Sequence, residues 1–238
     1  MSVECPCCGW LGEEFLPAGI VPRPNALCPG CGLVERHRLL WLYLRERTDF
    51  FTAKLKVLHI GPEGFFEKAF SAMSNLDYIS GDIKSSKAMR KVDITDISFG
   101  DHSFDVILCY HVLEHVQEDR KALRELYRVL KPNGWAILQS PVDQRLEKTY
   151  EDPTITTPED RLKHFHQKDH VRIYGIDFKN RIEGAGFILK LGDFVQELGE
   201  ETVKRFRLNI NERIYYCTKS LEIPVVEAPS NGVFNFEG

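Results

Sequence analysis

Four short apolar segments between Leu55 and Pro141 constrain the fold of this chain more than any other feature. They read LKVLHI, LDYISG, FDVILCY and WAILQSP. Short apolar runs of this kind are typical of strands that are buried on both faces of a sheet. Two stretches with helical spacing lie among them: FFEKAFSAM, and the run from about Glu118 to Leu130, which ends at a Pro- and Gly-containing turn. The pattern predicts an α/β fold with a doubly wound, mostly parallel sheet.

A glycine-containing turn, Gly61-Pro62-Glu63-Gly64, follows the first strand and precedes a helix. Glycine lets the backbone approach a ligand closely, and the helix N-terminus offers free N–H groups. Asp82 follows the second strand, about 20 residues later, where nucleotide-binding α/β domains place an acid that accepts hydrogen bonds from ribose hydroxyls. Either feature alone also fits a simple connection or a solvated acid. Together they predict a nucleoside-binding site at the carboxyl ends of the strands.

Further motifs follow this turn in a fixed order. They are Gly81-Asp82-Ile83, Val92-Asp93-Ile94, Phe104-Asp105-Val106-Ile107, His111-Val112-Leu113-Glu114-His115-Val116 and Arg128-Val129-Leu130-Lys131-Pro132-Asn133-Gly134. In this order, and over about a third of the chain, they resemble the class I S-adenosylmethionine-dependent methyltransferases of the widespread small-molecule type. The resemblance implies a Rossmann-like domain with a seven-stranded sheet and S-adenosylmethionine as the cofactor.

The resemblance also implies which residues hold the cofactor. Gly61 and Gly64 would lie under its methionine and ribose parts, and Asp82 would hold the ribose hydroxyls. The adenine would contact Ile83, Asp93 and Ile94, and the pocket would further be lined by His59, Cys109 and His111. Glu114 and His115 also have a structural interpretation, as an acid that orients a loop and a histidine packed against a helix.

Two positions depart from the family pattern. Many members carry an acid where this chain has His59, and that acid often supports the amino group of the methionine part. Another group must therefore take this role here. Phe65 stands where a third glycine often occurs. Both departures support a rival hypothesis, in which the chain keeps the fold as a non-catalytic binding or scaffolding protein.

Methyl transfer to a hydroxyl group needs a base, and histidine titrates near neutral pH. The candidates are His111 and three histidines of the long segment after WAILQSP, namely His164, His166 and His170. That segment follows a strand whose carboxyl end should face the cofactor. A polar lid with solvated histidines and a metal site remain alternatives for the three. We predict transfer to an oxygen, or secondarily to a nitrogen, of a small-molecule or glycan-like acceptor.

Two Cys-x-x-Cys knuckles, each followed by glycine, lie near the N-terminus in CPCCG and CPGCG. Two such knuckles supply the four soft ligands that tetrahedral zinc requires. We predict a structural zinc ion bound by Cys5, Cys8, Cys28 and Cys31, with Cys7 as an alternative ligand. A zinc-ribbon RNA methyltransferase is the second hypothesis, although residues 1–54 carry six positive and six negative side chains and so no basic surface.

We therefore predict four parts: a zinc-ribbon-like module (1–33), a connecting helix (34–53), the methyltransferase domain (54–220) and a tail (221–238). No apolar run approaches the roughly 20 residues that cross a bilayer, and the first residues lack the character of a signal peptide. We accordingly expect a cytoplasmic protein. A net charge of −4 argues against a broad nucleic-acid surface. The oligomeric state is not predicted.

Overall fold

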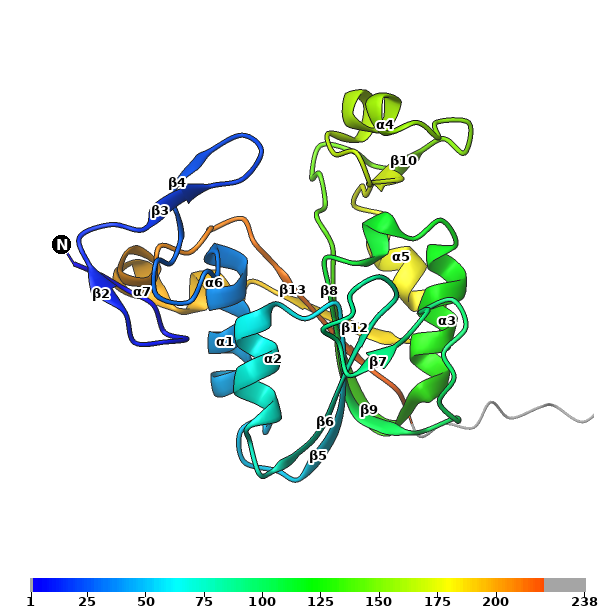
Figure 1. The fold of residues 1–238 in the computed structure, drawn as a ribbon, viewed down its shortest axis with the longest axis horizontal. Coiled ribbons are helices and arrows are strands. Elements are labelled where there is room, and N and C mark those ends of the chain that lie inside the picture. The colour runs from blue at the N-terminus through cyan, green and yellow to red at the C-terminus, as the bar shows by residue number, and fades with distance from the viewer. Residues whose placement is uncertain (1, 221–238) are drawn as a thin grey trace, which may run out of the picture.

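A seven-stranded sheet forms the centre of the molecule in the computed structural model, which describes residues 2–220 (Figure 1). The strand order is β12-β13-β9-β8-β5-β6-β7. In chain order these strands are β5 (Leu55–Ile60), β6 (Leu76–Asp82), β7 (Arg90–Lys91), β8 (Phe104–Tyr110), β9 (Leu130–Gln139), β12 (Ile188–Gly192) and β13 (Ile214–Thr218). The predicted tail, 221–238, lies outside the described residues.

The sheet is mostly parallel, as predicted. The strands β5, β6, β7, β8 and β9 pair in parallel, and β13 pairs antiparallel with both β9 and β12. The strand order reverses at β5, from which the chain proceeds first to β6 and later to β8. Ligands of doubly wound sheets bind at the carboxyl ends of the strands beside such a reversal.

Successive side chains of β5 point to opposite faces of the sheet, and each face is covered by helices. Val57 contributes to one hydrophobic core with α1 (Glu35–Arg47), α2 (Gly64–Ser71), α6 (Phe194–Glu197) and α7 (Gly199–Phe206). Leu58 and Ile60 contribute to the other with α3 (Asp119–Val129) and α5 (Phe178–Glu183). Figure 1 shows the two groups of helices on either side of the sheet. The predicted Rossmann-like architecture is therefore confirmed.

The N-terminal module, called the ribbon below (residues 2–33), consists of two short hairpins. β1 (Val3–Glu4) pairs with β2 (Leu11–Gly12), and β3 (Leu16–Ala18) pairs with β4 (Arg23–Leu27). The ribbon lies beside α1 and α7 (Figure 1). Its own core is small, with four buried residues, Val3, Cys5, Phe15 and Cys28.

The segment between β9 and α5, called the lid below (residues 141–173), rises above the carboxyl ends of the strands (Figure 1). It contains β10 (Tyr150–Glu151), α4 (Pro158–Phe165) and β11 (Arg172–Ile173), and β10 pairs with β11. The Thr157 hydroxyl caps α4 by accepting the N–H of Asp160 at 3.1 Å. Within residues 2–220, the helices are all too short or too polar to traverse a bilayer.

Candidate active site

A cavity of about 360 Å³ opens at the carboxyl ends of β5 and β6. Five of the residues predicted to bind a nucleoside cofactor line it: Gly61, Asp82, Ile83, Asp93 and Ile94. The structure therefore brings together side chains from three separate motifs. We call this the first cavity.

The two acids of the first cavity are held by their own loops. One oxygen of Asp82, Oδ1, accepts the backbone N–H groups of Lys84 and Ser85 at 2.6 and 2.7 Å. Asp93 Oδ1 accepts the N–H and the hydroxyl of Thr95 at 2.8 and 2.7 Å. These bonds hold the pKa of Asp93 below its ordinary value, and the bond from the backbone N–H has the largest effect. Within residues 2–220, Oδ2 of each acid makes no hydrogen bond.

The glycine turn is shaped for close approach at its first glycine. Gly61 has φ +60°, a conformation that favours glycine, and a Cβ there would lie 3.0 Å from Val112 Cγ2. Gly64, the first residue of α2, is exposed, and a Cβ there would meet nothing within 4 Å. Close approach of a ligand to the backbone thus depends on Gly61. Gly64 does not line the cavity.

Two further predicted cofactor residues do not line either the first cavity or the one described next. His59 is fully buried beneath α2, where its Nδ1 lies 3.0 Å from the Tyr78 hydroxyl. Burial lowers the pKa of His59 to about 4, so the ring is neutral at pH 7. Cys109 is fully buried on the opposite face of the sheet, and burial raises the pKa of its thiol. Both residues therefore pack inside the core, and neither reaches the cavities where the sequence placed them.

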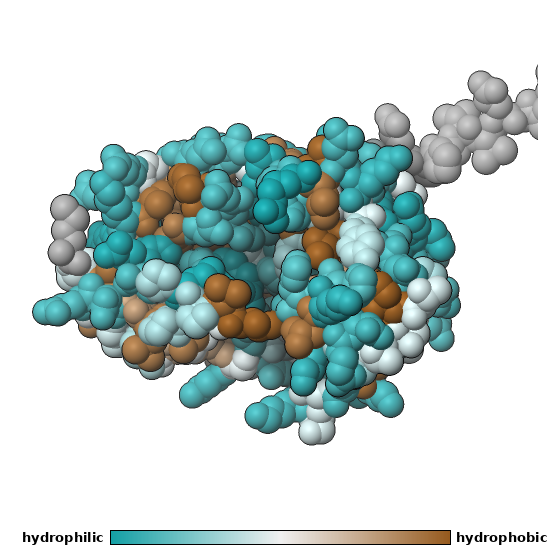
Figure 2. Space-filling model, turned by 90° about the horizontal axis from the view of Figure 1, so that it is seen from above, coloured by the Kyte–Doolittle hydropathy of each residue, from teal (hydrophilic) through white to brown (hydrophobic). Residues whose placement is uncertain are grey.

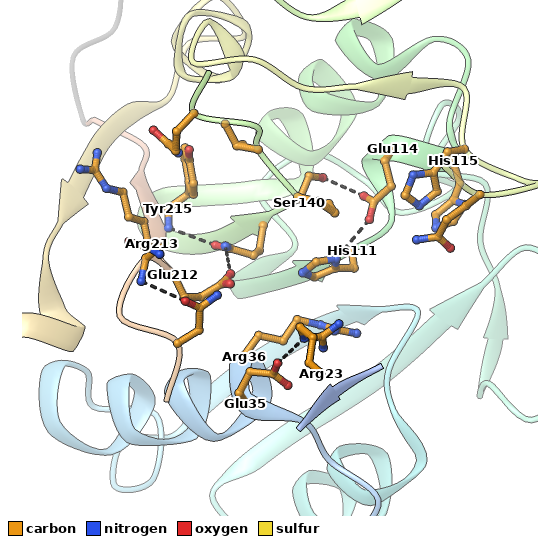
Figure 3. A pocket seen from close by; sticks show the side chains of 18 residues that line it. Arg23, Glu35, Arg36, His111, Glu114, His115, Ser140, Glu212, Arg213 and Tyr215 are labelled. Atoms are coloured by element: carbon orange, nitrogen blue, oxygen red, sulfur yellow. Dashed lines mark hydrogen bonds and ion pairs between the residues drawn. The ribbon is translucent and has the colours of Figure 1, made fainter. Parts of the chain in front are cut away.

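A second cavity, of about 580 Å³, lies beside the first, between α1, the carboxyl ends of β8 and β9, and the lid. Figure 3 shows its polar side chains converging from these elements, and Figure 2 shows the hollowed, largely hydrophilic surface at this end of the molecule. His115 lines both cavities, so they share a wall. The arrangement fits a cofactor in the first cavity and an acceptor in the second.

Glu114 joins Ser140 and His111 at the floor of the second cavity. One oxygen accepts the Ser140 hydroxyl at 2.8 Å, and the other lies 3.2 Å from His111 Nδ1 (Figure 3). Burial favours the neutral acid, but the hydrogen bond and charge of His111 outweigh it and lower the pKa of Glu114. His111 adopts φ +56°, which is uncommon for a residue with a side chain, and its Nε2 has no hydrogen-bond partner within residues 2–220. The carboxylate therefore orients the imidazole, and the unpartnered Nε2 is itself buried.

The three lid histidines are placed differently from one another. His170 is buried and lines the second cavity. His164 lies 2.7 Å from the Tyr150 hydroxyl within the lid, and it lines neither cavity. His166 is exposed at the end of α4 and faces a third cavity, described below. Of the candidate bases, His111 and His170 are therefore the two that share the second cavity.

Sequence reasoning missed several groups of the second cavity because they come from distant segments. Arg36, on α1, points into it, and its guanidinium has no hydrogen-bond partner among the described residues. Glu212 accepts the amide of Gln139 at 2.8 Å, and burial raises the pKa of Glu212. Arg23 enters from the ribbon, paired with Glu35 at 2.6 Å. The clustering of arginines around position 36 was the one sequence feature that could have pointed to these groups.

A third cavity, of about 930 Å³, continues the second one between the ribbon and the lid. Its walls include exposed apolar side chains from both modules, Ile20 and Val21 from the turn between β3 and β4, and Leu162 from α4. The ribbon thus contributes a wall to the cleft in addition to its own small core.

Four cysteine sulfurs of the ribbon converge. Those of Cys5, Cys8, Cys28 and Cys31 lie within 4.8 Å of one another, and the two closest pairs are 3.7 Å apart. Tetrahedral zinc with Zn–S bonds of about 2.3 Å places its sulfurs about 3.8 Å apart. The donor set therefore fits zinc, and Cys7 is not part of it.

Comparisons with known proteins agree on one family. Residues 67–138 match the family described as "Methyltransferase domain". The chain is 37% identical over 76 residues to an uncharacterized methyltransferase, YcgJ, of Bacillus subtilis (strain 168), covering 32% of this chain and 28% of that protein. It is 48% identical over 46 residues to the demethylmenaquinone methyltransferase of Clavibacter sepedonicus, covering 19% of each. The matches thus span less than a third of these relatives' own length.

Among solved structures, the cyclase SpnF is similar with a TM-score of 0.51 and 15% identity, covering 78% of this chain and 82% of that chain. Similarity at this level of identity shows the fold. Because SpnF is named as a cyclase, the fold by itself does not assign a reaction.

Proposed function

We propose that this chain, which carries a class I methyltransferase domain, transfers a methyl group from S-adenosylmethionine to an oxygen of a small-molecule or glycan-like acceptor. The observation that carries the proposal is the pair of adjoining cavities, one with nucleoside-binding acids and one with an oriented histidine. Nitrogen is the second choice of acceptor atom.

The first cavity has the features that a nucleoside cofactor requires. Asp82 Oδ2 is available for ribose hydroxyls, and Ile83 and Ile94 offer apolar surfaces to a base. Gly61 leaves room that a Cβ would fill. When bound, S-adenosylmethionine supplies a methyl group activated by a positively charged sulfur.

Replacing Asp82 by asparagine is expected to weaken S-adenosylmethionine binding by about 10- to 100-fold, because hydrogen bonds to a charged acceptor are worth about 1.5–3 kcal/mol. The measurement is titration calorimetry with S-adenosylmethionine. The matched control is Asp77→Asn, at the opposite end of the same strand, where the carboxylate is exposed. Absence of binding heat with the unaltered protein at high concentration would refute the enzyme hypothesis and favour a scaffold.

Glu63 is our candidate for the acid that supports the methionine amino group in place of His59. Its Oε1 lies 2.6 Å from His37 Nε2, and Oε2 has no hydrogen-bond partner within residues 2–220. His37 Nδ1 accepts the Val34 N–H, so the proton of the neutral ring lies on Nε2, the nitrogen that faces Glu63. Burial opposes ionisation, but the bond from His37 lowers the pKa of Glu63 to about 2. Glu63 is therefore a fixed negative charge at the glycine turn.

Replacing Glu63 by glutamine is expected to weaken S-adenosylmethionine binding by about tenfold, since one charge-assisted hydrogen bond is lost. Binding of S-adenosylhomocysteine, which has the same amino group, should weaken equally. The control is Glu67→Gln, on the first turns of α2, where the carboxylate instead accepts the Ser80 hydroxyl. Unchanged affinity for both compounds in Glu63→Gln would exclude this role.

His111 is the residue we assign as the general base for the acceptor. Glu114 fixes its ring through Nδ1, and Nε2 is left to accept a proton. In the transfer, the acceptor oxygen forms a bond to the methyl carbon while the carbon–sulfur bond breaks and the sulfur keeps its electron pair. The acceptor's proton passes to His111 Nε2. The lid and the ribbon contribute walls to the second cavity, where the acceptor would lie.

The charges around the cleft favour a small acceptor over RNA. Three arginines of the ribbon and its neighbouring helices are paired with acids, Arg23 with Glu35, Arg47 with Glu197, and Arg205 with Glu4, and within residues 2–220 Arg36 is the unpaired arginine of the second cavity. Paired arginines leave little positive charge for phosphates. The polar second cavity and apolar third cavity together suit a compound with a polar group and an apolar part.

To test the acceptor class, methyl-labelled S-adenosylmethionine and the protein are added to three fractions of a cell extract, small molecules, RNA and protein, and the fraction that becomes labelled is identified. We expect the label in the small-molecule fraction, in a form stable to the mild base that hydrolyses methyl esters. Label in RNA would instead establish the zinc-ribbon RNA methyltransferase.

We further propose that the four ribbon cysteines bind a structural zinc ion.

A further inference from the structure

Three side chains of the second cavity form a cluster that the proposed transfer does not by itself require. Glu114, His115 and His170 each place a donor atom within 4.8 Å of the other two. Glu114 and His115 belong to the short 3-10 helix Leu113–His115 after β8, whereas His170 belongs to the lid. Two segments that are 55 residues apart therefore meet at one point in the cleft.

The backbone holds these two segments together tightly. The N–H of Val171 donates to the carbonyl of Glu114 at 2.9 Å. The buried guanidinium of Arg172 donates to three carbonyls that flank the cluster, those of Leu113, Val116 and Gln117. The donors are thus positioned by bonds that do not involve a ligand.

His115 and Glu114 have the surroundings of metal ligands, and His170 is buried beside them. His115 Nδ1 lies 3.2 Å from the Asp169 carboxylate and 3.3 Å from its carbonyl, which leaves Nε2 free. Metal-binding histidines usually have such a partner on the other ring nitrogen. Glu114 is oriented by Ser140, and its oxygens have further lone pairs. His170 is only 6% exposed, yet its ring has no hydrogen-bond partner within the described part of the chain.

We propose that Glu114, His115 and His170 bind a divalent transition-metal ion of the Zn²⁺ class. Two imidazoles and one carboxylate suit such ions, and three protein ligands leave an open coordination position. Bonds of about 2.0–2.1 Å would bring tetrahedral donors to about 3.3 Å from one another, a side-chain movement of about 1.5 Å or less. All three residues line the second cavity, so the open position faces the acceptor.

The role of this ion rests on the proposed function, whereas its binding does not. The open position would hold the acceptor oxygen and lower the pKa of its hydroxyl. The proton still passes to His111, the oxygen–methyl bond forms and the carbon–sulfur bond breaks. The donor set therefore selects acceptors whose reacting hydroxyl can coordinate a metal.

Cobalt substitution of the full chain tests the binding. Co²⁺ in the cysteine site shows thiolate-to-metal charge-transfer absorption, whereas Co²⁺ bound by nitrogen and oxygen shows only d–d bands. We expect a second ion of the latter kind, and its affinity should fall at least 100-fold in Glu114→Gln and in His170→Ala. The matched control is His102→Asn, an exposed-loop residue with φ +54° that asparagine tolerates, and it should bind both ions normally.

An unchanged thiolate band in each variant shows that the ribbon remains folded, and an unchanged circular dichroism spectrum shows the same for the sheet. If Co²⁺ saturates the chain without any ion bound by nitrogen and oxygen, the proposal is overturned. A second ion that persists in His170→Ala would overturn it as well. Calorimetry with S-adenosylmethionine on the same samples separates the two proposals. Cofactor binding without the second ion refutes the metal site alone, and the second ion without cofactor binding refutes the proposed function alone.

Discussion

Replacing Cys28 and Cys31 together by serine is expected to abolish zinc binding by the ribbon and to unfold residues 2–33 while the sheet stays folded. The ribbon buries only four residues in its own core, two of them proposed zinc ligands. Zinc binding in small zinc-finger peptides contributes about 10–16 kcal/mol, which is more than so small a core can supply. The measurements are zinc content and amide hydrogen exchange of the ribbon relative to the sheet.

The matched control is Cys7→Ser, which removes the neighbouring thiol that lies outside the group of four. This variant should keep the zinc ion of the ribbon and normal exchange protection. A thiolate-to-metal band that persists in the cobalt-substituted double variant would refute the proposed ligand set.

Replacing Arg38 by methionine is expected to destabilise the chain by about 3–4 kcal/mol, because buried carbonyls would lose their donor. The fully buried guanidinium donates to Ala26 and Phe206 carbonyls at 2.8 Å, to Arg207 at 3.1 Å, and to two more carbonyls at 3.4 Å. It therefore joins the ribbon to the end of α7. Burial lowers the pKa of Arg38, although the nearby cysteines act in the opposite direction.

Urea unfolding measures this effect, and Arg45→Met on the same helix is the control. Arg45 is half exposed and paired only with the adjacent Glu46, so its loss should cost less than about 1 kcal/mol. A loss below about 1 kcal/mol in Arg38→Met as well would show that water replaces the guanidinium without penalty.

The sheet and the first cavity were predictable because they depend on local patterns. Apolar runs, a glycine turn and the acid after the second strand lie close together in sequence and identified Asp82, whereas Asp93 was identified from the family resemblance. The predicted cavity lining differed from the structure where a shift of one position along a strand decides which face of the sheet a side chain occupies. His59 and Ile60 are neighbours, yet His59 points under α2 and Ile60 toward the first cavity. Applying this alternation to β5 would have excluded His59 from the cavity.

The second cavity was less predictable because its walls come from six segments spread along the chain. Arg36 and Glu212 are separated by most of the chain, and neither belongs to a motif. The three lid histidines have similar spacing in sequence, but only His170 lies where the backbone of the lid bonds to Glu114. Which histidine enters the cavity depends on α4 ending at His166 in a left-handed conformation, a tertiary detail that spacing does not specify.

The strand order has a consequence for synthesis on the ribosome. β13 lies between β9 and β12, yet it is the last strand of the sheet in chain order. While the chain emerges, one edge of β9, with the apolar residues Trp135 to Leu138, remains without a neighbour until residues 214–218 have left the exit tunnel. At about 5–20 residues per second this interval lasts several seconds. A nascent chain that stalls before β13 therefore presents an open, apolar strand edge, the kind of surface that chaperones bind and that otherwise initiates aggregation.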